Sequence, residues 1–412
     1  MFGKGSLILV LGFSMIFMVS GVSFNRVANS TIDNYAKYYF AAKTRYLANA
    51  GVNIINNRLW KNASVTDKTI QFSFDGGTIV DSLVTIDSYR NIKKLVSTGT
   101  MTLSDGTTYS STVKIILQPS LFSKFAYFSD NEGGTIYWTT KDTIWGPMHT
   151  NDNLNINGNP VFMNDVSYGS TINKANGSND HPQFFGSLDS HVNIVIPDTG
   201  VQHVSGQATA GSTISGHSLV YFEFRGDSVR YRYSTSGSYT YKLLSTFAPT
   251  GVVYFHNAEV HVSGTVKGRY SIVADGTSGN QGSFYLENDL VYNTNPQTNS
   301  ASTDMLGIVA LDNVWITDNT NNNSGGIKIQ ASIYCQTGSF GAQNYNTRPS
   351  AGFIDLYGGI TQKTRGAVGV IGGNGSISNG FSKRYRYDTR LLTSYPPAFP
   401  GCGSYEIVSW FE

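Results

Sequence analysis

Charged side chains are scarce in this sequence. Its 412 residues include 29 Lys and Arg and 27 Asp and Glu, which together make up 14% of the chain and leave a net charge of +2. Neither a basic stripe nor an acidic block is present. The sequence therefore predicts no nucleic-acid partner and no acidic solvating tail.

Cysteine is rarer still, with only Cys335 and Cys402. The two residues do not form the CxxC or Cys/His spacings that are typical of metal sites. Outside the cytoplasm they could form one disulfide. Two unpaired buried thiols are the alternative.

Glycine and aromatic residues, in contrast, are plentiful. The chain has 44 Gly and 13% aromatic residues, alongside many Asn, Ser and Thr. This composition is typical of a β-rich, turn-rich exterior protein, and the aromatic content argues against disorder. A chain of this length can bury a large core, in more than one domain or in one long repetitive domain.

The chain begins with an uncharged apolar run over residues 6–24. A bilayer core of about 30 Å needs about 20 apolar residues in a helix, so the run is about long enough to span a membrane. Its apolar side chains are predicted to form a membrane helix: Leu7, Ile8, Leu9, Val10, Leu11, Phe13, Ile16, Phe17, Val19 and Val22.

Three interpretations of this run stay open. A secretory signal would be removed near residues 19–21. An uncleaved anchor would keep the run, with Lys4 on the cytoplasmic side. A prepilin would be cut on the cytoplasmic side between Gly5 and Ser6 and keep the apolar helix. The Lys4-Gly5 pair directly before the run favours the prepilin.

The run continues without proline into residues 27–60, which predict a helical extension. Leu47, Val52, Ile55 and Leu59 fall at helical spacing and are expected to pack on a folded body. A second set extends the same predicted face: Tyr35, Tyr39, Ala42, Tyr46, Ala50 and Ile54. Residues after a cleaved signal have no reason to continue its helix, so the extension favours retention of the run.

Residues 36–51 (AKYYFAAKTRYLANAG) resemble the end of the N-terminal helix in PilX-type minor pilins and related pseudopilins. Those proteins usually have Glu before their Ala-Gly pair, whereas this chain has Leu47-Ala48-Asn49 there. Major pilins also have Glu five residues into the mature chain, where this sequence has Val10. The resemblance therefore implies a minor or tip-type subunit and substrate of a prepilin peptidase.

The remaining chain divides into three predicted regions after the helix of residues 1–62. Residues 63–119 predict a small antiparallel sheet, because four alternating segments are separated by turn sequences. Residues 120–380 contain short strands that recur about every 20 to 25 residues from Gly251 onward, which is typical of a solenoid. Residues 381–412 form a predicted capping tail. We expect a mainly β protein whose body is a right-handed parallel β-helix, with a β-sandwich as the alternative.

Two further segments resemble an uncharacterised bacterial surface family. They are residues 144–162 (IWGPMHTNDNLNINGNPVF) and the tail, with GFSKRYRYDTRL at 380–391 and PPAFP at 396–400. That family joins a pilin-like helix to a β-helical body and has no established enzymatic activity. The resemblance implies the same architecture here.

Candidate binding residues are few. His149 with Asp142 or Asp152 could form a base or metal site, although a His in a turn more often bonds nearby backbone. Calcium could bind the oxygen-rich segments 130–132 or 312–323, which otherwise are solvated loops. Glu259 and His261 share a strand face while His256 does not, leaving too few ligands for zinc. We predict no cofactor apart from this possible calcium.

The basic tail could lock itself onto the solenoid by pairing Arg386 and Arg390 with Asp388, or it could bind an anionic glycan. An end cap is favoured because an open solenoid edge invites pairing with other chains.

Two functions remain. The favoured one is a structural or adhesive protein, not an enzyme, anchored in the cytoplasmic membrane with its body outside the cytoplasm, at the cell surface or in a pilus. It would be a minor subunit of a type IV pilus or related secretion filament. Its partners would be lipid, other pilin subunits and surface glycans. The alternative is a polysaccharide lyase or hydrolase that uses carboxylates among Asp275, Glu287, Asp289 and Asp312.

Overall fold

The computed structural model describes residues 3–412 apart from residues 62–65, 88–90, 135, 141 and 373–376. The chain forms two compact units. The helix–sheet unit comprises Met1–Pro119 and Ser404–Glu412, and the body comprises Ser120–Gly403.

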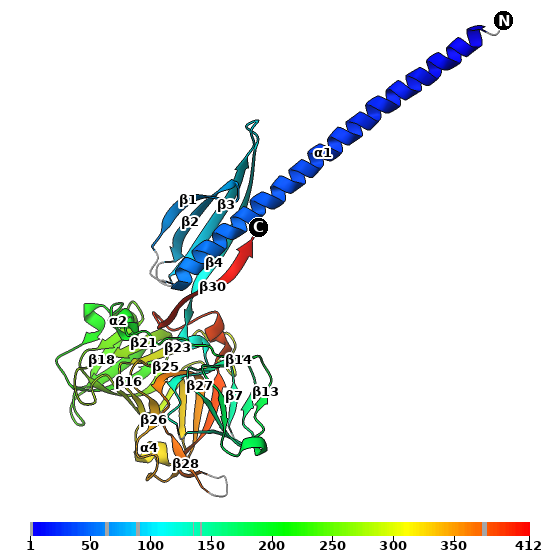
Figure 1. Ribbon diagram of the computed structural model, residues 1–412. Coiled ribbons are helices and arrows are strands. Elements are labelled where there is room, and N and C mark those ends of the chain that lie inside the picture. The colour runs from blue at the N-terminus through cyan, green and yellow to red at the C-terminus, as the bar shows by residue number, and fades with distance from the viewer. Residues whose placement is uncertain (1–2, 62–65, 88–90, 135, 141, 373–376) are drawn as a thin grey trace. The chain divides into compact units, whose positions relative to one another are not determined.

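In the helix–sheet unit, one helix lies along a small sheet (Figure 1). The described strands have the order β1-β2-β3-β4-β30, and β1 to β4 are antiparallel neighbours. The elements are α1 (Gly3–Lys61), β1 (Lys68–Phe74), β2 (Gly77–Asp87), β3 (Ile92–Thr102), β4 (Thr108–Leu121) and β30 (Gly401–Phe411). The antiparallel sheet predicted after the helix is thus confirmed, with a strand from the C-terminal segment added.

The C-terminal half of α1 packs on this sheet through aliphatic side chains. Leu47, Val52, Ile55 and Leu59 are at most 1% exposed and share a core with β2, β3 and β4. Gly51 permits the close approach, since a Cβ there would run into the side chains of Asp81 and Ser97.

The tyrosines on the neighbouring stripe of α1 do not join this core. Tyr35, Tyr39 and Tyr46 are 50% or more exposed. The prediction that these tyrosines form part of the buried packing face is therefore wrong. Thr44 is the first buried residue along α1 in the described part. Tyr46 lies at the rim of the contact with the sheet, where its ring stacks on the partly exposed Phe74 of β1 with 6.4 Å between the centroids.

The N-terminal half of α1 packs against nothing in the described chain. Its apolar side chains between Leu7 and Val22 are 48% or more exposed. An 18-residue window of α1 has a mean hydropathy of 2.3 and no buried residue, so by length and composition this helix could cross a membrane. One helix thus has an apolar exposed half and a packed half.

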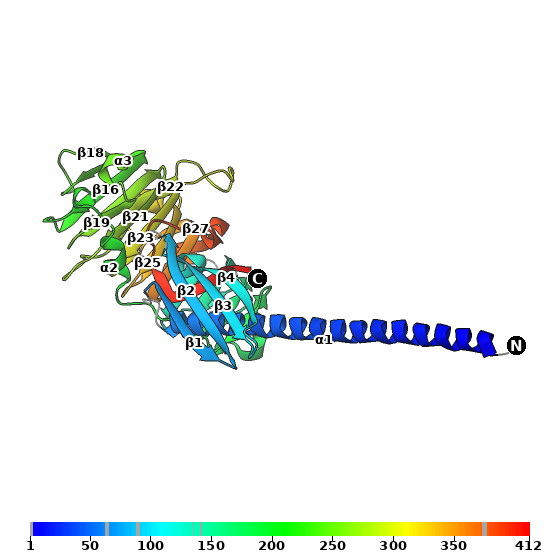
Figure 2. The ribbon, with the colours of Figure 1, turned by 90° about the horizontal axis from the view of Figure 1, so that it is seen from above.

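The body is built mainly from parallel strand pairs, which stack side by side in Figure 2. These pairs form two rows, in each of which every strand is hydrogen-bonded to the next. Row one has the order β15-β19-β21-β23-β25-β27-β5-β8-β11-β14, with every pair parallel. Its strands are β15 (Thr213–Ile214), β19 (Val252–Phe255), β21 (Arg269–Ala274), β23 (Met305–Ala310), β25 (Ile327–Cys335), β27 (Ser350–Thr364), β5 (Tyr127–Asn131), β8 (Met148–Thr150), β11 (Val166–Tyr168) and β14 (Leu188–Ser190).

Row two shares β25 and β27 with row one and runs β16-β20-β22-β25-β27-β29-β7-β10-β13, again parallel. Its other strands are β16 (Leu219–Gly226), β20 (Glu259–Val266), β22 (Phe284–Tyr292), β29 (Ile377–Tyr387), β7 (Thr143–Trp145), β10 (Val161–Phe162) and β13 (Gln183–Phe184). The first half of β22 continues in parallel to β24 (Val314–Ile316) and β26 (Phe340–Ala342).

Other elements complete the body. β6 (Trp138–Thr139), β9 (Leu154–Asn157) and β12 (Ile172–Lys174) form a separate parallel sheet. β17 (Ser228–Arg232), β18 (Thr240–Leu243) and β28 (Gly369–Ile371) pair antiparallel with their neighbours. The short helices are α2 (Gly200–Ser205), α3 (Leu244–Phe247) and α4 (Thr320–Asn323).

The chain enters the stack in its middle rather than at an end. From β5 it proceeds outward through β8, β11 and β14, which we call the first arm. It then restarts at β15 and returns through β19, β21, β23 and β25 to β27, which we call the second arm. The arms meet where β27 pairs with β5 and β29 pairs with β7, and we call this place the junction.

A buried ladder of side chains crosses the junction without a break. In row one, residues in register on successive strands all point into one core: Val253, Ile272, Ile308, Ile333, Ile360, Tyr127, Met148 and Val166. Burying each such side chain contributes roughly 1.5–3 kcal/mol. The ladder therefore opposes any slip of one residue in either arm, which would turn these side chains out of the core.

The prediction of a mainly β protein with one long N-terminal helix is confirmed. The largest sheet network is mixed, because antiparallel strands join the parallel rows. The boundary predicted between residues 62 and 63 falls outside the described residues. The predicted tail 381–412 is divided between the two units: β29 belongs to the body, and most of β30 belongs to the helix–sheet unit.

Asp81 provides a test of how α1 packs on the sheet. It is 1% exposed, and burial raises its pKa against the opposing effects of the Ser97 hydroxyl and the Arg58 charge. Stability from this group is therefore greatest below its unfolded pKa and is lost as the pH rises through its folded pKa. We expect Asp81→Asn to flatten this dependence and to stabilise β2 and β3 by about 1 kcal/mol at neutral pH. Hydrogen exchange of the detergent-solubilised chain measures this.

The control is Asp33→Asn at an exposed position of α1, which should leave exchange in β2 and β3 unchanged. An equal pH dependence in wild type and Asp81→Asn would show that Asp81 is not its source.

Candidate functional site

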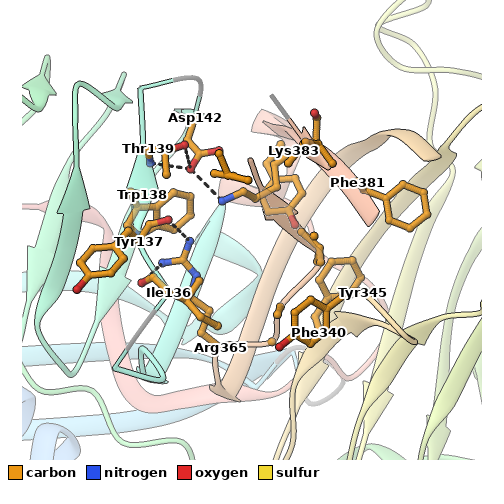
Figure 3. Close-up of a pocket in the computed structure, with 18 of the residues that line it drawn as sticks. Ile136, Tyr137, Trp138, Thr139, Asp142, Phe340, Tyr345, Arg365, Phe381 and Lys383 are labelled. Atoms are coloured by element: carbon orange, nitrogen blue, oxygen red, sulfur yellow. Dashed lines mark hydrogen bonds and ion pairs between the residues drawn. The ribbon is translucent and has the colours of Figure 1, made fainter. Parts of the chain in front are cut away.

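A cavity of about 570 Å³ lies at the junction of the two arms (Figure 3). Its wall comes from β6, β26, β27, β29 and the segment that follows β27. Much of the lining is aromatic, with Trp138, Phe340, Tyr345, Phe353, Phe381 and Tyr385.

Two buried ion pairs border this cavity. Arg365 Nη1 lies 2.6 Å from Glu132 Oε2, and both side chains are at most 4% exposed. Lys383 Nζ lies 2.9 Å from Asp142 Oδ2, and Figure 3 shows the lysine reaching toward this carboxylate. Each pair crosses the junction. Glu132 directly follows β5 and Arg365 directly follows β27, whereas Asp142 directly precedes β7 and Lys383 lies on β29.

Trp138 lies between these charges. Its ring centroid is 4.1 Å from the Arg365 guanidinium and 5.0 Å from Lys383 Nζ. Such cation–π contacts favour the charged forms of both side chains. The guanidinium also donates to the carbonyls of Ile136 and Tyr137, both at 3.4 Å.

Burial is the largest influence on the pKa values of Lys383, Tyr127 and Arg365. It lowers the pKa of Lys383; the Asp142 carboxylate opposes this effect and the Arg365 charge adds to it. Burial likewise raises the pKa of Tyr127 well above its usual range, helped by the Glu132 charge. For Arg365, burial would lower the pKa, but Glu132 outweighs it and the pKa is raised. The site thus holds two compensated ion pairs, and the pKa of Lys383 lies below its ordinary value.

Glu132→Gln tests the buried pair. The change leaves the Arg365 charge buried without a carboxylate, so we expect a loss of about 3–5 kcal/mol in unfolding free energy. Chemical denaturation of the full chain in detergent, followed by tryptophan fluorescence, measures the loss.

Asp130→Asn is the matched control, because the neighbouring Lys363–Asp130 pair joins the same two strands but is 46% and 28% exposed. It should cost less than about 1 kcal/mol. Equal losses in the two variants would contradict the assigned role of burial.

His149 forms no hydrogen bond with Asp142 or Asp152 in the described structure, the two carboxylates considered as its catalytic partners. Its ring nitrogens contact Ser167 Oγ and Asn151 Oδ1, both at 2.7 Å, and burial lowers its pKa. Asp152 accepts instead from the backbone of Glu132, and Asp142 pairs with Lys383. The alternative of a structural histidine fits these contacts.

The oxygen-rich segments are occupied by internal contacts. Asp130 pairs with Lys363, Glu132 pairs with Arg365, and Asp318 accepts from Asn323 and Asn344. Among the described residues, no cluster of three or more His, Cys, Asp or Glu side chains could hold a metal. Calcium binding therefore remains a prediction without a preformed cluster.

A second polar cluster lies on row two. Glu259 and His261 do share a strand face, with His261 Nε2 at 2.8 Å from Glu259 Oε1. The structure adds Glu287, whose Oε1 lies 2.5 Å from His261 Nδ1. His256 contacts Asp275 instead. The contact between Glu287 and His261 was not predicted from the sequence, because only the parallel register of β20 and β22 brings these two residues together.

Aromatic rings stack on His261 from both sides. Tyr221 and Tyr285 lie in register with it, with centroids 4.5 and 4.9 Å away. Trp315 continues the series on β24, and opposite it stands Gly341, where a Cβ would meet the indole ring. We call Tyr221, His261, Tyr285 and Trp315 the aromatic ladder.

The histidine of this ladder should titrate unusually. Burial would lower the pKa of His261, but the hydrogen bonds to Glu287 and Glu259 outweigh it and the pKa is raised. The stabilisation is present below the unfolded pKa and is lost as pH rises through the folded pKa. We expect Glu287→Gln to lower the His261 pKa, measured by NMR of histidine-labelled protein.

Asp275→Asn, which alters a carboxylate near His256 instead, should leave the His261 titration in place. An unchanged His261 pKa in Glu287→Gln would refute the assignment.

The other proposed catalytic carboxylates face separate local partners. Asp275 accepts from Tyr254 and the backbone of Asn257, Asp289 from the backbone of Lys328, and Asp312 from Asn313. These contacts bind neighbouring strands and loops to each other.

The comparisons with known proteins are limited. Residues 88–170 match a domain of unknown function, described as "Domain of unknown function (DUF4900)". No curated protein matches the sequence. The crystal structure of the competence-associated pilin ComZ from Thermus thermophilus aligns with 90% of this chain and 97% of its own, at 11% identity and a TM-score of 0.38. A likeness this weak does not establish a shared fold.

The tail residues make defined contacts in the body. Arg390 binds Asp388 through Nη2 at 2.6 Å and donates to the Ser302 carbonyl at 2.8 Å. Arg386 lies on β29 opposite Tyr357 and makes no ion pair with Asp388 in the described structure. The Tyr395 and Pro397 carbonyls accept from Arg269 and Ser271 of β21. The tail thus covers a side of the second arm.

The described structure contains no disulfide between Cys335 and Cys402. Cys335 is fully buried on β25, and burial raises the pKa of its thiol. Cys402 packs at the edge of the cluster that contains Tyr334. Their pairing stays a prediction.

Proposed function

We propose that this chain is a pilin-like structural or adhesive protein, anchored in the cytoplasmic membrane by α1 with its body outside the cytoplasm. It would be a minor subunit of a type IV pilus or a related secretion filament. The observation that carries the proposal is the division of α1 into an apolar half that nothing covers and a half packed on the sheet.

The exposed half requires an apolar partner. A continuous surface of side chains from Leu7 to Val22 is far larger than the scattered apolar residues on a soluble surface, and such surfaces mark membrane or protein contacts. Lipid chains fit it, and so do the equivalent helices of neighbouring subunits, which associate by side-chain packing. The exposed tyrosines that follow fit a membrane–water interface.

We further propose that the parallel rows form a right-handed β-helix from residue 120 to about 380, that residues 63–119 form the pilin-like sheet, and that the part of the tail in the body, residues 381–403, closes it. The in-register buried ladder and parallel pairs support this. They favour it over a sandwich, because β-sandwiches are antiparallel. Right-handed crossovers between parallel strands are the general rule.

An adhesive role would place a surface glycan against the edges of the aromatic ladder on row two, because its ring faces stack on each other and Tyr285 is 6% exposed. The carboxylates considered for catalysis make internal contacts, which favours the structural role over a glycan-cleaving one.

N-terminal sequencing of the membrane-associated protein tests the anchor. We expect a mature N-terminus at Ser6, because the prepilin interpretation places cleavage after Gly5. Gly5→Leu should leave Met1 in place, whereas Gly3→Leu, three residues from the same bond, should still be cut.

An intact Met1 in wild type would refute the prepilin interpretation and leave a plain anchor. A terminus near Val22 would refute both, because the apolar helix would be absent from the mature chain.

A further inference from the structure

Three ion pairs fasten the first arm to the strands that return to it. They are Lys363–Asp130 at 2.7 Å, Arg365–Glu132 at 2.6 Å and Lys383–Asp142 at 2.9 Å. The first is substantially exposed. The second is buried, but its cation is a guanidinium, which is not a nucleophile at any ordinary pH. Only the third of these pairs combines a lysine with a buried carboxylate.

We propose that Lys383 and Asp142 condense to form an intramolecular isopeptide bond, an amide between Nζ and Cγ. This reaction does not depend on whether α1 anchors the chain in a membrane. It would occur once, during folding, when β29 pairs with β7 and brings the two side chains together.

The surroundings suit this chemistry. The amine and the carboxylate are held in contact, which replaces an encounter between separate molecules with a reaction at high effective concentration. Lys383 Nζ lies over the Trp138 ring and Asp142 is 6% exposed, and away from solvent an ion pair and its neutral form differ less in free energy than in water. The lowered pKa of Lys383 increases the share of free amine, the form that attacks.

The backbone supplies a further element. The Thr139 N–H donates to Asp142 Oδ2 at 2.9 Å, and Thr139 Oγ1 lies 3.4 Å from the same oxygen. Donors placed on a carboxyl oxygen stabilise the negative charge that develops there as the carbonyl carbon is attacked. The cavity beside the pair gives the leaving water a place to go.

The reaction balances without any co-reactant. The ammonium first passes one proton to the carboxylate, giving an amine and a carboxylic acid. The Nζ lone pair then forms a bond to Cγ, a second Nζ proton moves to the hydroxyl oxygen, and the C–O bond breaks. One amide and one water result, with no change in net charge.

The product would join residues 241 positions apart in the sequence. It would therefore tie the two arms together at the junction covalently. Neither cysteine is needed for such a bond.

Intact-mass measurement of the purified, denatured full chain tests the proposal. We expect most molecules to have a mass one water below the mass calculated from the sequence, counted from the N-terminus found by sequencing. Because Asp-Gly sequences can also lose water, protease digestion must in addition yield a branched peptide that contains Lys383 and Asp142.

Lys383→Arg keeps a cation opposite Asp142 and should have its full sequence mass and no branched peptide, with an unchanged circular dichroism spectrum. Lys363→Arg, which alters the exposed pair, should retain the water loss. A full-mass wild type, a loss that persists in Lys383→Arg, or a branch at other residues would overturn the proposal.

Discussion

The stacking of buried side chains in register along parallel strands is the constraint on which the body depends. Each rung of the ladder lies directly on the next, from Val253 on β19 to Val166 on β11. The series stays continuous only because β27 of the second arm pairs with β5 of the first. The cavity and the buried ion pairs exist because the arms meet at this one place.

Charges in the core at the junction have a physical rationale. A slip of one residue between β27 and β5 would turn every apolar side chain of a strand to the wrong face. A slip of two would keep that pattern, so apolar packing alone discriminates less against it. Either slip between β27 and β5 would break the Arg365–Glu132 contact, and the equivalent slip between β29 and β7 would break the Lys383–Asp142 contact, which leaves charges without partners.

The periodicity of the sequence predicted the features that are formed by residues close together in the chain. It found α1, the antiparallel sheet and the shared face of Glu259 and His261, because these depend on residues a few positions apart. It misplaced the tyrosine stripe of α1, since both stripes have helical spacing and only the sheet decides between them. It could not find the partners of Glu132 and Asp142, because those lie 233 and 241 residues away. The contact of Glu287 with His261 was missed too, because the register shifts between β20 and β22.

The entry of the chain into the middle of its own stack has a consequence for biogenesis. A chain that emerges N-terminus first presents β5 before its partner β27 has been made, so one edge of the first arm stays open through more than two hundred residues of synthesis. Open edges recruit strands from other chains. Pairings this distant in sequence also form slowly. This sheet edge therefore has to be shielded from other chains until β27 of the second arm pairs with β5.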